Sequence, residues 1–181
     1  MPYGGAHSHV PGAQLLFPTP VWGTNYVAIA TPRGTDPTPG PLWMQILGQK
    51  DGSMVDVLPS VDLPAGGGLA AAPAGAMATF TVNAGEYLQW QLAPGSLDVS
   101  GTIVQSSEPI ALFAGNRFFR DQPMPDAGGE ATHQQNLPVS ALSSEYVAAP
   151  YATRRKDLAP EPVGYRFVGM VDGTSLSYDP S

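Results

Sequence analysis

Residues 78–116 contain runs in which apolar and polar side chains alternate with a period of two. This pattern constrains the fold more than any other feature. A period of two is typical of a β-strand with one buried face and one face in water. No helical period separates the successive runs. The apolar positions of the first two runs are Phe80, Val82, Leu88, Trp90 and Leu92. The stretch therefore predicts consecutive strands at the centre of an all-β domain.

The segments between and after these runs support four successive strands. Asn83–Glu86 separates the first two runs and contains Gly85, which adopts the backbone conformations of turns without steric cost. Residues 110–114 are apolar at every position, which predicts a strand covered on both faces.

Three further strands are predicted closer to the N-terminus, at residues 26–30, 43–49 and 54–58. The Asp51-Gly52 pair between the last two predicts a β-hairpin, because Asp-Gly favours the tight turn that joins paired strands. Residues 64–75 are rich in Gly, Ala and Pro and predict a flexible loop.

The C-terminal part of the sequence repeats the N-terminal part. Residues 145–150 (Glu-Tyr-Val-Ala-Ala-Pro) match residues 25–30 (Asn-Tyr-Val-Ala-Ile-Ala) at a spacing of 120 positions. Residues 167–180 match residues 46–59 at a spacing of 121, with an Asp-Gly pair and a closing proline in both copies. Self-similarity at fixed spacing indicates a tandem architecture. We expect the chain to be a piece of a longer array.

We therefore predict an antiparallel β-sandwich-like module followed by the start of a second repeat, with propeller-like blades as the alternative. Residues 1–20 are expected to be an extended leader, residues 21–138 the first module, and residues 139–181 the first strands of the second repeat. Whether these last strands dock on the first module, or complete it, is left open by the sequence.

Composition excludes several classes of function. The formal net charge is −7, with only eight Lys and Arg, so the chain lacks the basic face that binds nucleic acid or an anionic membrane. The basic cluster Arg154-Arg155-Lys156 is short and predicts a solvated loop. The absence of cysteine excludes disulfides, thiol catalysis and thiolate-bound zinc. No apolar run approaches the ~18 residues of a membrane span, and the first five residues show no signal peptide.

The residues suited to catalysis or metal binding do not form a motif. His7 and His9 sit in the Gly-rich leader, where solvated side chains are expected in preference to metal ligands. His133 and Glu130 would not share a face in a strand, so a structural histidine is favoured over an acid–base pair. The acids that could gather around Ca²⁺ lack the spacing of a calcium loop and are interpreted as solvated. These acids are Asp121, Asp126 and Glu130.

Nucleophile and phosphate-binding motifs are absent from the sequence. Gly66-Gly67-Gly68 precedes no helix start, so it does not predict a phosphate site. We expect no enzyme, no cofactor and no metal. Among the tryptophans that could line a sugar-binding face, Trp43 is the candidate, because Trp90 alternates with leucines on a buried face. Trp22 is the third tryptophan.

The central stretch carries a family resemblance. Val82-Asn83-Ala84-Gly85-Glu86-Tyr87 and the run from Leu97 to Asn116, which contains Gly-Thr-Ile-Val-Gln-Ser-Ser-Glu-Pro-Ile-Ala and Phe-Ala-Gly-Asn, resemble the IgG Fc-binding protein N-terminal domain and its bacterial relatives. Residues 133–147 resemble the family's Gln-Leu-Pro-Pro segment and following strand, and the whole resemblance covers about residues 25–180. Two departures are the missing cysteines after Gly-Asn and Val139 in place of a second proline.

Within this resemblance, three residues are interpreted as turn or bulge positions and not as ligand contacts, and Pro109 is expected to start a strand. The three are Gly101, Gly115 and Asn116. The resemblance implies an exported, surface-associated β-module with a binding or adhesion role. We expect a non-enzymatic extracellular or cell-surface module that binds a protein or a glycan. The alternatives are a structural subunit of a surface layer or filament, which associates through strand edges, and a carbohydrate-binding domain.

Overall fold

The computed structural model describes residues 13–31, 41–92, 98–119, 130–149, 152–153, 155–160 and 164–179. Seven strands form one antiparallel sheet, and two 3-10 turns are the only helical elements among these residues. The strands are β1 (Gly23–Val27), β2 (Leu42–Gly48), β3 (Ser53–Leu58), β4 (Ala78–Val82), β5 (Tyr87–Gln91), β6 (Ile103–Phe119) and β7 (Glu130–Gln135). The turns are η1 (Thr19–Val21) and η2 (Val139–Ala141). The predicted all-β antiparallel class is confirmed, whereas the sandwich and propeller alternatives stay predictions.

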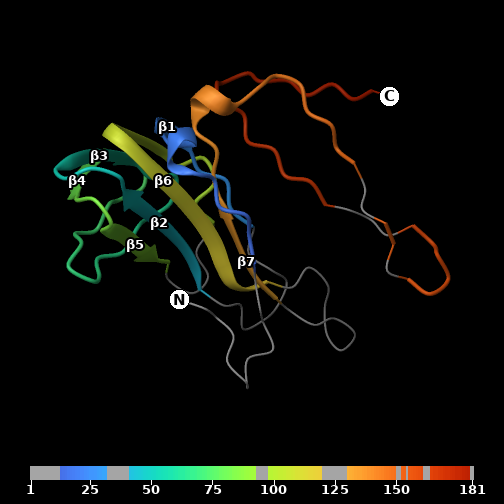
Figure 1. Ribbon diagram of the computed structural model, residues 1–181, viewed down its shortest axis with the longest axis horizontal. Coiled ribbons are helices and arrows are strands. Elements are labelled where there is room, and N and C mark those ends of the chain that lie inside the picture. The colour runs from blue at the N-terminus through green and yellow to red at the C-terminus, as the bar shows by residue number, and fades with distance from the viewer. Residues whose placement is uncertain are drawn as a thin grey trace.

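The long strand β6 organises the sheet (Figure 1). Its first half pairs with β1 on one edge and with β3 on the other. Its second half pairs with β7 on one edge and with β2 on the other. β4 extends the first half beyond β3, and β5 extends the second half beyond β2. The sheet therefore consists of two four-stranded halves that share β6.

The two halves bury one common core. Alternate residues of β2, β3 and β5 point inward, as the period of two predicts, whereas β6 is buried at consecutive positions in its second half. The core includes Met44, Ile46, Val55, Val57, Trp90 and Leu112. Phe80 on β4 and Trp90 on β5 meet edge to face with ring centroids 5.0 Å apart, so the outermost strands of the two halves contact each other through side chains. Trp90 is a core residue, as predicted.

β6 has no ladder partner at Ser107–Pro109, between its two halves. Pairing with β3 ends at Ser106 and pairing with β2 begins at Ile110. Pro109 is tolerated here because its missing N–H would have no ladder partner. The prediction that Pro109 starts a strand is wrong, since β6 is continuous through it.

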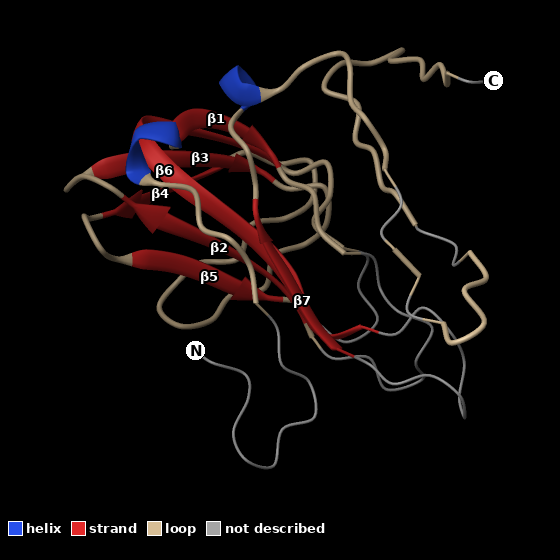
Figure 2. Cartoon of the chain, turned by 45° about the vertical axis from the view of Figure 1, so that its right-hand side comes forward, coloured by secondary structure: helices blue, strands red, loops and turns tan. Residues whose placement is uncertain are grey.

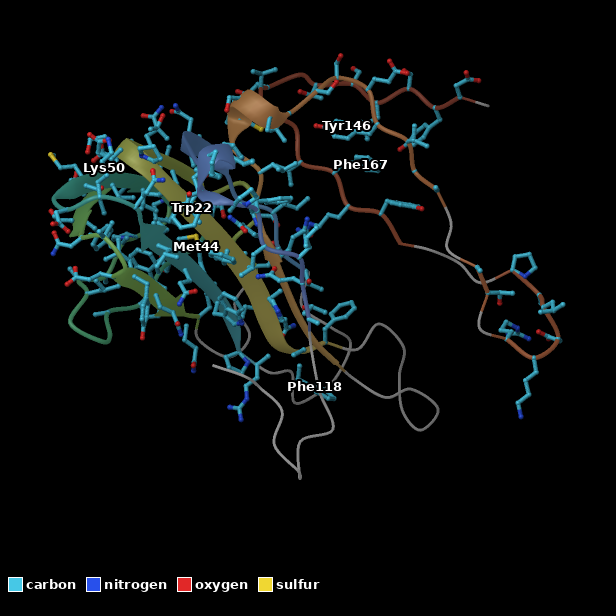
Figure 3. The ribbon with its side chains drawn as sticks, viewed as in Figure 1. Trp22, Met44, Lys50, Phe118, Tyr146 and Phe167 are labelled. Atoms are coloured by element: carbon cyan, nitrogen blue, oxygen red, sulfur yellow. The ribbon has the colours of Figure 1, made fainter. Side chains whose placement is uncertain are left out.

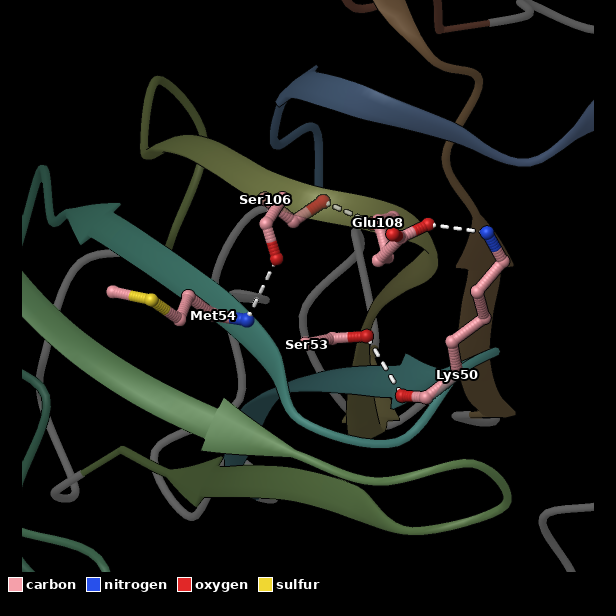
Figure 4. Close-up of polar contacts among 6 residues, drawn as sticks. Lys50, Ser53, Met54, Ser106 and Glu108 are labelled. Carbon is pink, nitrogen blue, oxygen red and sulfur yellow. Dashed lines mark hydrogen bonds and ion pairs between the residues drawn. The ribbon is translucent and has the colours of Figure 1, made fainter.

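Side chains replace the missing ladder bonds around this interruption (Figure 4). The Ser107 hydroxyl accepts the N–H of Met54 at 3.0 Å, and the Ser106 hydroxyl donates to the carbonyl of Glu108 at 2.7 Å. Lys50 pairs with the Glu108 carboxylate at 2.6 Å. The two serine bonds satisfy backbone groups that the ladder leaves unpaired, and the ion pair joins two side chains beside them.

Tyr26 ties β1 to the same region from the core side. Its buried hydroxyl donates to the Ile110 carbonyl at 2.6 Å and accepts the Gly23 N–H at 2.9 Å. Burial raises the pKa of the Tyr26 phenol, and the hydrogen bond from Gly23 opposes this rise.

The two predicted tight turns join strands that belong to different halves. β2 and β3 do not pair with each other, so the predicted Asp51-Gly52 hairpin is wrong. The turn after β2 and the turn after β4 instead bond to each other: Asn83 Oδ1 accepts the Gly52 N–H and Asp51 Oδ1 accepts the Ala84 N–H. Gly48 donates to the Glu86 carbonyl at 3.0 Å. The Asn83–Glu86 segment of the family-like motif is therefore a structural corner.

Residues 64–75 are more ordered than predicted. Backbone bridges join Leu63 to Ala72 and Gly66 to Leu69, and Leu63 and Ala72 are buried in the core. Asp62 accepts the N–H of Ala74 at 2.8 Å and closes the base of the loop. Gly67 and Gly68 have positive φ at its tip, which explains the glycine run without a ligand.

The C-terminal segment after η2 lies beside the sheet as loop (Figure 2). None of the described residues after Gln135 is a strand, so the second repeat expected in residues 139–181 stays a prediction. Of the predicted leader, residues 1–12 lie outside the described residues, and η1 forms its end.

Candidate binding surface

One outer face of the sheet combines aromatic rings with amide side chains. It belongs to the half formed by β5, β2, β6 and β7, whose register aligns residues in rows across the strands. We call it the amide–aromatic face. Its first row is Gln91, Trp43, Gly115 and His133; its second is Gln89, Gln45, Phe113 and Gln135; its third is Tyr87, Leu47 and Ala111.

Trp43 lies flat on the sheet at the centre of the first row. A Cβ added to Gly115 would lie 2.7 Å from Cζ2 and 2.9 Å from Cε2 of the Trp43 ring, so the ring covers the glycine backbone directly. The His133 ring is the next neighbour, with centroids 6.5 Å apart and a tilt of 33°. Trp43 remains partly exposed. This packing fixes the ring against the β6 backbone.

The predicted turn or bulge role of Gly115 is therefore wrong, because it lies inside β6 and packs against Trp43. Gly101 does form a turn, with a φ of 89°. Asn116 precedes a bulge in the β6–β7 ladder, and its Oδ1 accepts the Phe118 N–H at 3.0 Å. Both of these predictions are confirmed.

The amides of the face divide into exposed and buried groups. Gln45 donates to Gln89 across the strands at 3.2 Å, and Gln89 and Gln91 are exposed. Gln135 is buried, and its side-chain oxygen accepts the Phe17 N–H at 2.7 Å. Exposed glutamines beside an aromatic ring offer both donors and acceptors to a polar ligand.

The N-terminal segment covers the β7 side of the face and limits its extent. Gln14 accepts the backbone N–H of Gln135 at 2.8 Å, on the edge of β7 that does not pair with β6. Trp22 donates its indole N–H to the Phe17 carbonyl at 3.1 Å, so it holds this segment in place. The open part of the face therefore centres on β5 and β2.

The amide–aromatic face carries few charged groups. None of its residues is an acid, a lysine or an arginine. Such a surface suits a neutral ligand better than a charged one, because it offers neither an ion pair nor compensation for a buried charge.

The other predicted site residues do not come together in the described part of the chain. His133 lies on β7 beside Trp43. His7, His9, Asp121 and Asp126, and the side chain of Glu130, lie outside the described residues. Within the described residues no group of three or more His, Asp or Glu side chains could hold a metal ion.

The glutamines of the face were missed in the sequence. The period of two places Gln89 and Gln91 on the polar side of a strand and gives no sign that they contact a ligand, and nothing in the sequence marks Gln45. Trp43 and Gln45 lie on the same side of β2, and Gln89 and Gln91 lie on the same side of β5. Only the register between β2 and β5 shows that these two sides form one surface.

Among the described residues, no helix has the length and apolar character to cross a membrane. Comparison with curated proteins and with solved structures gives no match. The family model described as IgGFc binding protein matches residues 12–181, which is nearly the whole chain. This all-β chain, with the family-like motifs at its corner turn and along β6, belongs to the IgGFc-binding family.

Proposed function

We propose that the chain is a non-enzymatic binding module whose ligand contacts the amide–aromatic face. The observation that carries this proposal is the Trp43 ring, held flat on Gly115 and flanked by the exposed amides of Gln89 and Gln91. A fixed aromatic platform with adjacent hydrogen-bonding groups binds ligands at low cost in conformational entropy, since little must be ordered on binding.

Two ligand classes fit this face. A neutral glycan has apolar ring faces that stack on an indole and hydroxyl groups that pair with amides. A protein surface rich in aromatic and amide side chains would use the same groups, because such residues are enriched in interfaces. The family description supports a protein ligand, and we place the module outside the cell or at its surface.

The decisive experiment compares matched amide substitutions. Gln91→Ala alters the face, whereas Gln105→Ala removes an exposed amide from β6 in the other half of the sheet. Both variants and Trp43→Ala are measured by calorimetry against a panel of neutral oligosaccharides and the Fc fragment of immunoglobulin G. We expect at least one probe to bind, Trp43→Ala to weaken it by about tenfold or more, Gln91→Ala to weaken it less, and Gln105→Ala to have no effect.

Two results would refute the proposed face. One is the absence of binding to every probe; the other is binding that neither Trp43→Ala nor Gln91→Ala alters. Thermal unfolding of each variant separates loss of contact from loss of structure, and Gln91→Ala serves as the variant whose exposed side chain leaves the fold intact.

The second candidate is a structural subunit that assembles through strand edges. β4 and β5 end the strand order, so each pairs on one side only, and an unpaired edge can accept a strand from another chain. This reading requires ordered oligomers at micromolar protein without any ligand, which light scattering detects.

A further inference from the structure

The C-terminal segment reproduces the local structure of the N-terminal strands without their pairing. η1 follows Pro18, and η2 follows Pro138, which lies 120 positions later. The two turns share their hydrogen-bond pattern. In each, the second bond of the turn measures 3.1 Å, from Trp22 to Thr19 and from Leu142 to Val139.

The tyrosine that follows each turn is also held in the same way. The Gly23 N–H donates to the Tyr26 hydroxyl, and the Ser143 N–H donates to the Tyr146 hydroxyl, at 2.9 Å in both cases. Tyr26 also donates to the Ile110 carbonyl of β6. Tyr146 is exposed and lies away from the sheet (Figure 3).

The Asp-Gly turns repeat as well, at a spacing of 121. The Ser53 hydroxyl donates to the Lys50 carbonyl at 2.7 Å, and the Thr174 hydroxyl donates to the Val171 carbonyl at 2.7 Å. Gly52 and Gly173 both have positive φ, at 67° and 77°. Turns depend on local bonds and form alone, whereas strands need partners.

The exposed apolar side chains of the second copy show which packing contacts it lacks. Five residues of the first copy that point into the core have apolar counterparts in the second copy, and every counterpart is exposed. Tyr26, Met44, Ile46, Val55 and Val57 are at most 1% exposed, whereas Tyr146, Tyr165, Phe167, Leu176 and Tyr178 are 60%, 48%, 48%, 55% and 68% exposed. The five residues of the first copy lie on β1, β2 and β3, and they are buried because these strands pack with β4, β5 and β6.

The second copy and the residues just before it contact the first module at two places. Asn136 bonds both backbone groups of Ile29, at 2.7 and 3.2 Å, and Pro138 lies against Gly23, where an added Cβ would be 2.6 Å away. Arg166 pairs with Asp98 at 2.9 Å. These contacts hold residues 136–138 and Arg166 against the first module and leave the exposed side chains named above uncovered.

We propose that residues 143–179 are the β1–β3 part of a second module, and that their partner is the β4–β7 part of another copy of this module. The contact runs through a β6-type strand, whose backbone would accept the Tyr146 hydroxyl as Ile110 accepts that of Tyr26. The η2 contact on β1 is then the joint between consecutive modules.

The test extends the full chain by a second copy of the β4–β7 part. Pro180-Ser181 matches Pro59-Ser60, so residues 61–142 are joined directly after Ser181. Hydrogen exchange with mass spectrometry then follows the amides of residues 143–149 and 165–178. We expect them to exchange about tenfold or more slowly than in the unextended chain, because they become ladder amides.

The control carries Leu112→Pro in the added copy alone, which breaks its β6 and should return the exchange to the rate of the unextended chain. The proposal is overturned if the extension leaves these amides exchanging at the unextended rate, whether the added residues fold elsewhere or stay unfolded. It is also overturned if the Leu112→Pro control protects them equally.

Discussion

The packing of Trp43 on Gly115 makes a quantitative prediction for Gly115→Ala. The new Cβ would lie 2.4 Å from the Thr132 carbonyl oxygen and 2.7 Å from the Trp43 ring. Normal carbon contacts begin near ~3.5 Å, so β7 or the indole would have to move by about 1 Å. The carbonyl belongs to the β6–β7 ladder and cannot turn away as a flexible side chain would.

We expect Gly115→Ala to lower the free energy of unfolding by about 1–3 kcal/mol, which is the usual cost of overpacking. Urea denaturation followed by circular dichroism measures this change. Gly164→Ala is the control, because no atom lies within 4 Å of its added Cβ and its φ is not positive, so its effect should stay within about 0.5 kcal/mol. A Gly115→Ala variant as stable as the parent would refute the packing described for Trp43.

Three further predictions concern Tyr26, the corner turns and the ion pair beside them. Burial raises the pKa of Tyr26 above 10.0, so at high pH the unfolded chain releases this proton before the folded chain does. The stabilisation from Tyr26 should be fully present below about pH 10 and should be lost as the pH rises toward the raised pKa. Tyr26→Phe should remove this part of the alkaline loss of stability in denaturation curves. Asn83→Ala should cost about 1 kcal/mol in urea denaturation, since Asn83 accepts the Gly52 N–H at the corner. Lys50→Ala should cost about 0–1 kcal/mol, because its ion pair with Glu108 is exposed, and a larger loss for Lys50→Ala than for Asn83→Ala would contradict the corner's assigned role.

The sequence predicted where the strands lie more reliably than which strands pair. The alternation around Trp90 and Leu88 identified β5 and its buried face. The Asp51-Gly52 signal predicted a reversal of the chain, and the chain does reverse there. Whether the joined strands then pair depends on β6, which lies more than 50 residues away in the sequence and takes both as neighbours.

The candidate surface could be predicted only in part, because it also depends on which strands pair. Trp43 could be selected by elimination, because Trp90 alternates with leucines on a buried face. Gly115 could not be understood without the structure, since its lack of a side chain serves a ring 72 positions earlier. Local patterns define the faces of single strands, whereas a binding surface is a property of several strands in register.

The sharing of β6 by both halves of the sheet has a mechanical consequence. A force that pulls on the two ends of the chain cannot release one half and leave the other, because each half loses its central strand when β6 detaches. Unfolding should therefore be all-or-none, and a row of such modules would lengthen in discrete steps. The shared strand therefore couples the two halves mechanically, so a load on the chain acts on the whole sheet at once.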